Sequence, residues 1–351
     1  MRLGVLRLRE KLQVLQNQTG YYEEIVEEMI NNQLLLFQKM YLKDREIKNI
    51  IIVDDYVSPI LHDKEICKNR PGYIERNTFM GFVDYVRKKS DFEISELLSV
   101  PEENVSLLFH SAILIKRMME IMEAELIWAP GVTLCDGIAY EYAENNKLTK
   151  MEHDFEKDII ACARNISKRY LGNRKRVETL ENITLTIFDS MKKVHALGKR
   201  ERLLLQIAAI LHDCGKYISL NSVGECSYSI VMATEIIGLS HLEREIVANI
   251  VMYNRCEFEY YDQIGKTTTL DQDSYLTIAK LTAILRVANG LDRSHKQKFK
   301  DIKVTVQDSQ MTIVVDTLED ITLEKGLITE KAKFFEEVFS VITVIKQKRK
   351  Y

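Results

Sequence analysis

The chain has 351 residues and a formal net charge of −3, with 46% hydrophobic and 29% charged residues. This near balance of charge excludes a global field that would demand nucleic acid or an anionic membrane as partner. The low content of proline and glycine, four and fourteen residues, disfavours a loop-rich β-sandwich and favours a helix-rich chain.

The six cysteines contain no CxxC pair, so their spacing is neither that of a zinc ribbon nor that of a redox motif. In a chain of this size the pattern indicates reduced intracellular thiols. The opening "MRLGVLRLREKL" is unlike a signal peptide, and the apolar runs are too short to span a bilayer. We therefore expect a cytoplasmic protein.

The first part of the chain, residues 1–148, alternates expected strands and helices. The opening "RLGVLRLRE" alternates leucines with arginines and predicts a strand that runs into a helix start. A helix over 21–41, a buried strand at "IKNIIIVDDY", an irregular stretch, a long helix after Pro101, a strand at "ELIWAPG" and a helix at "CDGIAYEYAENN" follow. This alternation favours an α/β layer domain.

The second part, residues 149–298, is helical in pattern almost throughout and predicts a separate all-α domain. The third part, residues 299–351, contains the alternating segments "IKVTVQD" and "MTIVVDT", which "SQ" joins as a hairpin. A last amphipathic helix is expected at about 328–346. The predicted fold class is therefore α+β, mostly helical.

The segment "AAILHDCGKYIS" places His212 and Asp213 side by side at a helix end. A His-Asp pair is the core of the HD phosphohydrolase motif, but two ligands cannot hold a catalytic metal. The alternative is a histidine packed in the core and an aspartate that ends a helix. Cys214 and Cys226 could form a thiolate site near His212, but a cysteine on an apolar helix is more often a small buried hydrophobe.

Three segments of the helical part resemble a known family: "ERLLLQIAAILHDCGKYIS", "CSYSIVMATEIIGLSHLEREIVANIVMYNR" and "LTIAKLTAILRVANGLDRSH". They are similar to the C-terminal HD-like domain of the exopolyphosphatase and guanosine pentaphosphate phosphohydrolase family. In an HD site an upstream histidine, the His-Asp pair and a later aspartate bind a divalent ion. At the other metal positions this chain has arginine, cysteine and asparagines: Arg176, Cys226, Asn254 and Asn289. A guanidinium repels a cation and an amide brings no negative charge, so we expect a degenerate site that holds no metal.

The first part resembles the second half of the family's actin-like, RNase H-like phosphatase domain, through "NIIIVDDYVSP", "FHSAILIKRMMEIMEAELIWAPG" and "LCDGIAYEYAE". In the family a Gly-rich "DxGGGS" phosphate loop precedes a segment like "LGVLRLRE", where this chain begins. "VDDYVSP", with Asp54 and Asp55, stands where the family has a small loop for phosphate. The resemblance therefore implies a protein that lacks the N-terminal catalytic half-domain and hydrolyses its substrates weakly or not at all.

Three functions follow from these comparisons of residues. The resemblance implies release of terminal phosphate from polyphosphate or guanosine pentaphosphate, with Mg²⁺ if activity is retained and no cofactor otherwise bound. The first alternative is a non-catalytic module for phosphate-ligand binding or dimerisation, and the second is a metal-dependent HD phosphohydrolase. The resemblance also implies a homodimer through the helical domain, and we expect polyphosphate or guanosine polyphosphate as ligand, without nucleic acid or membrane.

Four residues are candidates for ligand binding. Arg286 and Arg293, with Lys296 and Lys298 beyond them, could offer phosphate oxygens a basic wall, although solvated helix faces explain these side chains equally well. Asp136 and Gly137 lie where "LCDGIAY" resembles the family's "LREGLLY" segment.

Overall fold

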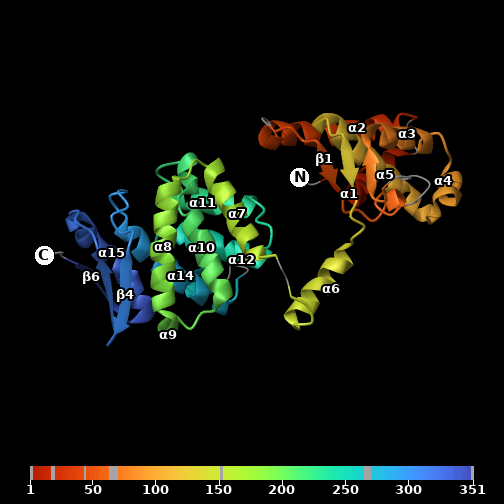
Figure 1. The fold of residues 1–351 in the computed structure, drawn as a ribbon. Helices are drawn as coiled ribbons and strands as arrows, with labels where there is room; N and C mark the ends of the chain where they lie inside the picture. The colour runs from red at the N-terminus through yellow and green to blue at the C-terminus, as the bar shows by residue number, and fades with distance from the viewer. Residues whose placement is uncertain are drawn as a thin grey trace. The chain divides into compact units, whose positions relative to one another are not determined.

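The computed structural model describes residues 3–16, 20–42, 45–62, 70–150, 153–264 and 270–348. The chain divides into two compact units, Met1–Met151 and Glu152–Tyr351, each with its own hydrophobic core (Figure 1). The described residues are mostly helical with two small sheets, which agrees with the predicted α+β class. Within these ranges no helix is both long enough and apolar enough to cross a membrane.

The first unit contains helices and short strands in mixed order. Its elements are α1 (Val5–Gln16), α2 (Tyr22–Phe37), the π-helical turn η1 (Gln38–Leu42), β1 (Asn49–Ile51), the 3-10 turn η2 (Ile60–His62), β2 (Tyr73–Glu75), α3 (Arg76–Val86), α4 (Asp91–Leu98), α5 (Glu102–Met122), β3 (Leu126–Trp128) and α6 (Leu134–Asn145).

The prediction of a strand at the chain start is wrong, because residues 5–16 form helix α1. Leu8 and Leu12 are four residues apart, and both are buried in a small core with Val26 and Ile30 of α2 and Ile113 of α5. A spacing of four residues places both leucines on one helix face. Burial of that face outweighs the local alternation of leucine with arginine.

The predicted strands β1 and β3 form the core sheet of the first unit. β1 runs parallel to β3, and β2 pairs with the other edge of β3 in the antiparallel direction, with Ile127 opposite both Ile50 and Ile74. The predicted long helix α5 begins directly after Pro101 and packs against this sheet with α3. The specific prediction that this unit is half of an actin-like domain stays a prediction.

The stretch predicted to be irregular contains β2, α3 and α4. Helix α3 buries Phe79, Val83 and Val86 along one face. Helix α4 begins with a capping box in which the Ser90 side chain accepts a hydrogen bond from the Glu93 N–H, and the Glu93 carboxylate accepts one from the Ser90 N–H. A serine followed three residues later by glutamate is a helix-start signal that the sequence carries.

The second unit contains the predicted helices and a three-stranded sheet. Its elements are α7 (Phe155–Arg169), α8 (Arg174–Ser190), α9 (Lys192–His195), α10 (Lys199–Leu211), the 3-10 turn η3 (Cys214–Tyr217), α11 (Val223–Ala233), α12 (His241–Tyr253), α13 (Tyr261–Ile264), α14 (Gln272–Leu291), β4 (Ile302–Gln307), β5 (Gln310–Val315), α15 (Thr322–Phe339) and β6 (Ile342–Gln347).

Helix α10 lies at the centre of the second unit. It is buried along most of its length, from Leu203 to Leu211, and contacts α7, α8, α12 and α14. Because α10 is apolar on nearly all sides in its second half, it fits only where helices surround it. His212 and Asp213 follow its last residue and are therefore held by the packed core.

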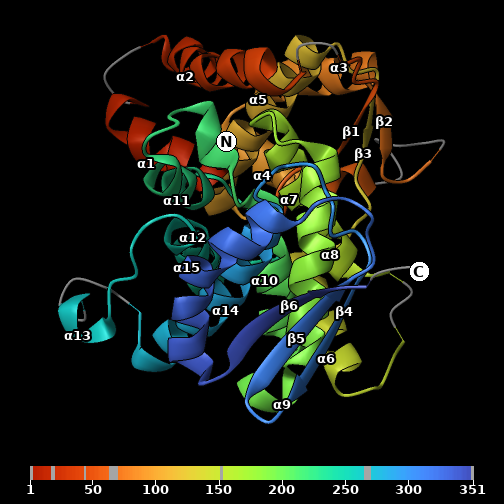
Figure 2. The same cartoon turned by 90° about the vertical axis from the view of Figure 1, so that its left-hand side faces the viewer.

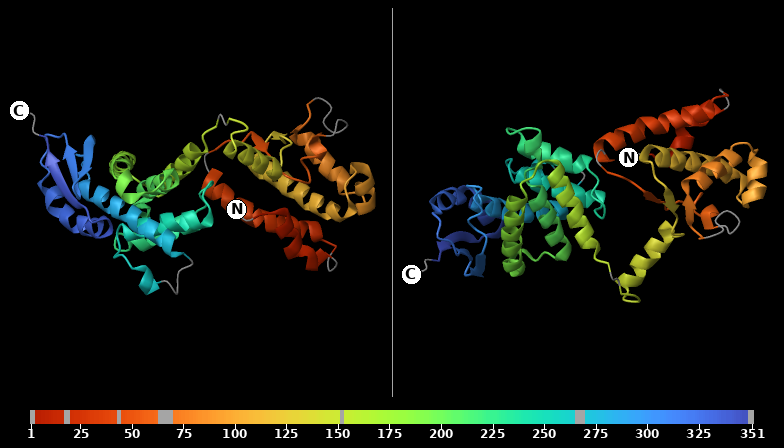
Figure 3. Two further views of the ribbon diagram at one scale, coloured as in Figure 1. Left: turned by 90° about the horizontal axis from the view of Figure 1, so that it is seen from below. Right: turned by 45° about the horizontal axis from the view of Figure 1, so that its top comes forward.

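The predicted hairpin is confirmed, and a third strand extends it. β4 and β5 pair antiparallel, but the two-residue turn is Asp308–Ser309, with positive φ at both positions, and not the predicted Ser309–Gln310, because Gln310 already pairs with Gln307. The predicted last helix at 328–346 is wrong in its second half, because α15 ends at Phe339 and residues 342–347 form β6, parallel to β5 (Figures 2 and 3). Ser340 ends α15 in the left-handed conformation, and the β-branched residues of "VITVI" then favour a strand.

Candidate functional site

The end of helix α10 holds His212 in the core. Its side chain is 0% exposed, and Nδ1 donates a hydrogen bond of 2.8 Å to the carbonyl oxygen of Ala209. Burial lowers the pKa of His212 to about 4, so the ring is neutral at pH 7. Nε2 then carries a lone pair, and it lies 3.5 Å from Oδ2 of Asp213 without a hydrogen-bond partner among the described residues.

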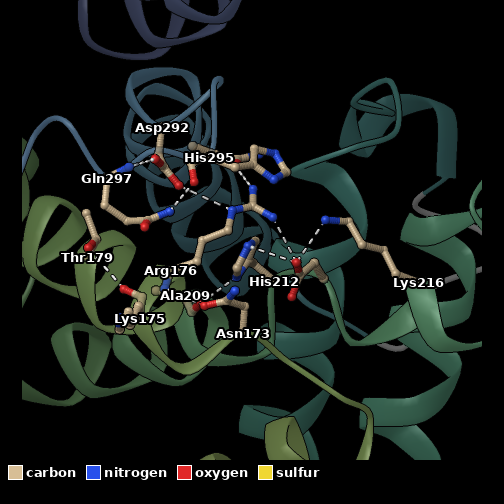
Figure 4. A network of polar contacts seen from close by, with 12 residues as sticks. Asn173, Lys175, Arg176, Thr179, Ala209, His212, Lys216, Asp292, His295 and Gln297 are labelled. Carbon is tan, nitrogen blue, oxygen red and sulfur yellow. Dashed lines mark hydrogen bonds and ion pairs between the residues drawn. The ribbon is translucent and has the colours of Figure 1, made fainter. Parts of the chain in front are cut away.

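Arg176 in the first turn of α8 reaches across to this helix end (Figure 4). Its side chain lies between two carboxylates: Nη1 is 2.9 Å from Oδ2 of Asp213, and Nε is 3.3 Å from Oδ2 of Asp292. Nη2 donates a bond of 3.2 Å to Oδ1 of Asn289 in α14. We call Arg176, His212, Asp213, Asn289 and Asp292 the Arg176 cluster.

The Arg176 cluster is removed from solvent. Arg176 is 4% exposed and Asp292 2%, so each charge depends on its partners rather than on water. Asp213 Oδ2 also accepts a hydrogen bond of 2.9 Å from Lys216 Nζ in η3. Burial alone raises the pKa of Asp213, but the interactions with His212, which is protonated in the acid range, with Lys216 and with Arg176 outweigh burial and lower the pKa to about 2.

The donor set of the Arg176 cluster does not fit a divalent metal ion. Throughout the described ranges no three His, Cys, Asp or Glu side chains gather closely enough to hold one. Asp213 and Asp292, the two carboxylates near His212, already bind the guanidinium of Arg176. At an effective dielectric constant of 20, two unit charges about 4 Å apart interact by roughly 4 kcal/mol, and a divalent ion would meet about twice that repulsion.

The neighbouring cysteines do not form a thiolate site. Cys214 is buried, and burial raises the pKa of its thiol to about 11. A thiol with a raised pKa is a poor nucleophile and a poor metal ligand. Cys226 is half-buried in α11. These positions agree with the interpretation of Cys214 as a small buried hydrophobe.

Arg286, one of the two arginines predicted to bind a ligand, instead contacts groups of its own unit. Its Nε donates to the carbonyl oxygen of Tyr253 at 2.7 Å, and its Nη2 donates to that of Cys256 at 2.6 Å. The guanidinium also lies over the ring of Phe334, 4.6 Å from its centroid. Arg286 thus binds carbonyl groups that the end of α12 leaves without helical partners.

Arg293 and Lys298 differ in exposure. Arg293 is exposed, and no ion pair of its side chain occurs within the described residues. Lys298, in contrast, makes an ion pair of 3.1 Å with the buried Glu324 of α15. Of the four side chains of the predicted basic wall, Arg286 and Lys298 are held by contacts within the unit, whereas Arg293 and Lys296 are exposed.

The two predicted ligand residues of the first unit lie in helix α6. Asp136 forms a capping box with Thr133, whose backbone N–H bond lowers the pKa of the carboxyl group. Gly137 is exposed, and a Cβ there would meet nothing within 4 Å. Asp54 of "VDDYVSP" accepts hydrogen bonds from the N–H groups of Tyr56 and Val57 and from the Ser111 hydroxyl. Asp54 therefore shapes the turn after β1.

Sequence reasoning did not single out Asp292, Lys216 and Arg255 near the His-Asp pair. Asp292 lies in "ANGLDRSH", three residues after Asn289, and supplies the second carboxylate of the Arg176 cluster. Lys216 follows Asp213 at a spacing of three, which in a helical turn brings an ammonium to a carboxylate. Arg255 directly follows Asn254. The signal for all three was that each lies within three residues of a motif position.

Comparison with protein families identifies the helical unit. Residues 160–331 match the family model described as Ppx/GppA phosphatase, domain III. This range contains the whole Arg176 cluster and extends into α15. A comparison with curated proteins found no match. The C-terminal portion of the chain, residues 160–331, therefore belongs to the Ppx/GppA phosphatase family as its domain III.

Proposed function

We propose that domain III of this chain binds a phosphorylated ligand, polyphosphate or a guanosine polyphosphate, and does not carry out metal-dependent hydrolysis at its His-Asp pair. The observation that carries the proposal is the guanidinium of Arg176 between Asp213 and Asp292. The permanently charged guanidinium forms ion pairs with the carboxylates on which an HD metal site depends. The Arg176 cluster is thus a degenerate HD site.

The energetics of burial support this assignment. Breaking a buried ion pair by removing one partner costs about 3 to 5 kcal/mol, because a charge is left uncompensated. A metal ion would have to displace Arg176 from two such pairs at once. The Cys214 thiol beside the cluster is held protonated at neutral pH, so it supplies no thiolate nucleophile.

Binding of phosphorylated ligands is supported by the positive side chains near the cluster. Lys216, Arg255 and Arg293 lie around Asp213 and Asp292, and two of the three have no ion pair within the described ranges. Such groups recognise phosphate by charge and by paired N–H donors. Family membership favours the same ligand class. The predicted homodimer stays a prediction.

The test compares hydrolysis with binding in the full chain. We expect the parent protein and the Asp213→Asn variant to show no difference in phosphate release from polyphosphate or guanosine pentaphosphate with Mg²⁺ or Mn²⁺. Asp189→Asn, on the exposed end of α8, is the matched control. We expect titration calorimetry to show polyphosphate binding that weakens with salt. Release that Asp213→Asn abolishes and Asp189→Asn preserves would establish a working HD site instead.

A further inference from the structure

Arg255 presents an unpaired guanidinium edge inside the second unit. Its Nε and Nη2 atoms are shielded from solvent, and neither has a hydrogen-bond partner within the described residues. The Nε–Nη2 edge is one that binds both oxygens of a carboxylate or phosphate through parallel N–H bonds. Leaving a buried donor unpaired costs about 1 to 3 kcal/mol, and more when the group is charged. The chemistry of this edge calls for an anionic acceptor.

The charges that face Arg255 are mainly positive. Burial lowers the pKa of Arg255, the positive charges of Arg176 and Arg293 lower it further, and only Asp213 acts in the opposite direction. Arg255 in turn contributes to the lowered pKa of Lys216 and of Lys331 in α15, in both of which burial is the first cause. These side chains therefore lie close enough to act on one another.

The two nearby carboxylates do not neutralise this excess. Oδ2 of Asp213 is shared between Arg176 and Lys216, each at 2.9 Å. Asp292 uses one oxygen for Arg176 and the other for the backbone N–H of Gln297 at 3.0 Å. With both carboxylates committed, the guanidinium edge of Arg255 has no carboxylate partner in the part of the chain that the structure describes.

Two neutral groups near Arg255 also offer hydrogen-bond donors: the side chain of Asn254 and the start of helix α11. Asn254, which is 0% exposed, has its Nδ2 donor without a partner in the described part of the chain. Helix α11 begins beside the arginine, since a Cβ at Gly224 would lie 3.5 Å from Cβ of Arg255. Its N-cap, Ser222, makes no side-chain cap bond to the first turn. A helix start without a side-chain cap adds positive potential to the same place.

We propose that Arg255, with Lys216 and Arg293, forms a binding site for a phosphoryl group. This inference rests on the proposed function and locates its ligand: the guanidinium edge of Arg255 receives two phosphoryl oxygens, and the other two side chains supply further charge. Polyphosphate and guanosine polyphosphates share this chemistry through their terminal phosphoryl groups. Because Arg176 occupies the carboxylates, the phosphoryl group is bound and not attacked.

The experiment measures binding of tripolyphosphate and of guanosine pentaphosphate to the full chain by titration calorimetry. We expect Arg255→Gln to weaken the binding of both probes at least tenfold, because a bidentate charge-assisted contact is lost. Arg293→Gln, at an exposed position, should weaken it about threefold. Lys333→Gln, which removes one exposed positive charge from α15, is the control and should stay within about twofold of the parent protein. Comparison of the two probes with guanosine tells a phosphoryl contact from a contact with the base.

Two negative outcomes have different meanings. If the parent protein binds both probes and Arg255→Gln binds them within twofold as tightly, this site is wrong and the proposed function stands. If the parent protein binds neither probe, the proposed function fails as well. Should thermal unfolding show that Arg255→Gln does not fold, the double variant Lys216→Gln, Arg293→Gln decides the question, with a tenfold loss expected and unchanged affinity overturning the site.

Discussion

Nη1 of Arg176 lies 2.9 Å from Oδ2 of Asp213, so the aspartate of the His-Asp pair is bound to a permanent cation. This one contact sets the charge of the whole cluster. A neutral imidazole would leave Asp213 available to a metal ion, whereas a guanidinium neutralises it. The same guanidinium also ties α8 to the end of α10 and to Asp292.

Arg176→Ala should destabilise the second unit by about 3 to 5 kcal/mol, because two buried carboxylates lose their common partner. Urea denaturation followed by far-UV circular dichroism measures this loss. Arg174→Ala on the same helix is the control, since its side chain is 90% exposed, and it should cost at most about 0.5 kcal/mol. Fluorescence of Trp128 reports the first unit, and its transition should not move. Equal losses in the two variants would contradict a buried role for Arg176.

The double substitution Arg176→His, Asn289→Asp should create affinity for a divalent ion. It removes the guanidinium and adds a nitrogen ligand and a carboxylate beside Asp213 and the free Nε2 of His212. Mn²⁺ or Zn²⁺ should then raise the melting temperature of the variant, as expected when a ligand binds the folded state. The parent protein under the same conditions is the control. A variant that no metal ion stabilises would show that more than Arg176 prevents metal binding.

Loss of the Arg200–Glu243 pair should make stability less dependent on pH in acid. Nε and Nη2 of Arg200 bind the two carboxylate oxygens of Glu243 at 2.5 and 2.9 Å, and this contact is the first cause that lowers the pKa of Glu243 to about 2. The folded pKa lies below the unfolded value, so the stabilisation is full above about pH 4.5 and disappears as pH falls toward 2.

Glu243→Gln should therefore lose about 0.5 to 1 kcal/mol at pH 7, discounted for the partial exposure of the pair, and progressively less as pH falls below about 4.5. Urea denaturation at pH 7, 5, 4 and 3 measures the difference. Glu319→Gln, at an exposed position before α15, provides the comparison. A difference between Glu243→Gln and the parent protein that stays constant from pH 7 to 3 would rule out the ion pair as its source.

Ser309→Gly should stabilise the β4–β5 hairpin by about 0.5 to 1 kcal/mol. Asp308 and Ser309 both have positive φ, 47° and 56°, and a type I′ turn of this kind favours glycine at its second central position. Ser309→Ala keeps the unfavourable conformation and should not stabilise the protein. Thermal unfolding of the two variants distinguishes them, and equal melting temperatures would argue against strain at Ser309.

The local sequence pattern was sufficient to predict most helices of the second unit and to indicate the family. Helices α7, α8, α10, α12 and α14 follow from apolar residues at helical spacing, because a helix that buries one face or all of its faces needs those residues whatever its neighbours are. The hairpin follows from two alternating segments with a short turn. The order of three motif segments was enough to indicate domain III.

Local pattern failed where a distant contact decided the outcome. "RLGVLRLRE" fits a strand or a helix, and α1 forms because Leu8 and Leu12 find a shared core with α2 and α5. Residues 342–347 form a strand because β5 lies beside them, with Ile313 opposite Ile345. Strand pairing joins residues far apart in the chain, so no window of a few residues contains it.

The candidate site shows the same division. The sequence by itself predicts that Arg176, Asn254 and Asn289 stand at positions where metal ligands are expected. The partners of Arg176 could not be predicted in this way, because Asp213 and Asp292 come from different segments that meet only when α8, α10 and α14 pack together. Whether a buried charge is compensated depends on that packing, and the same packing leaves the buried guanidinium edge of Arg255 without a partner within the described residues.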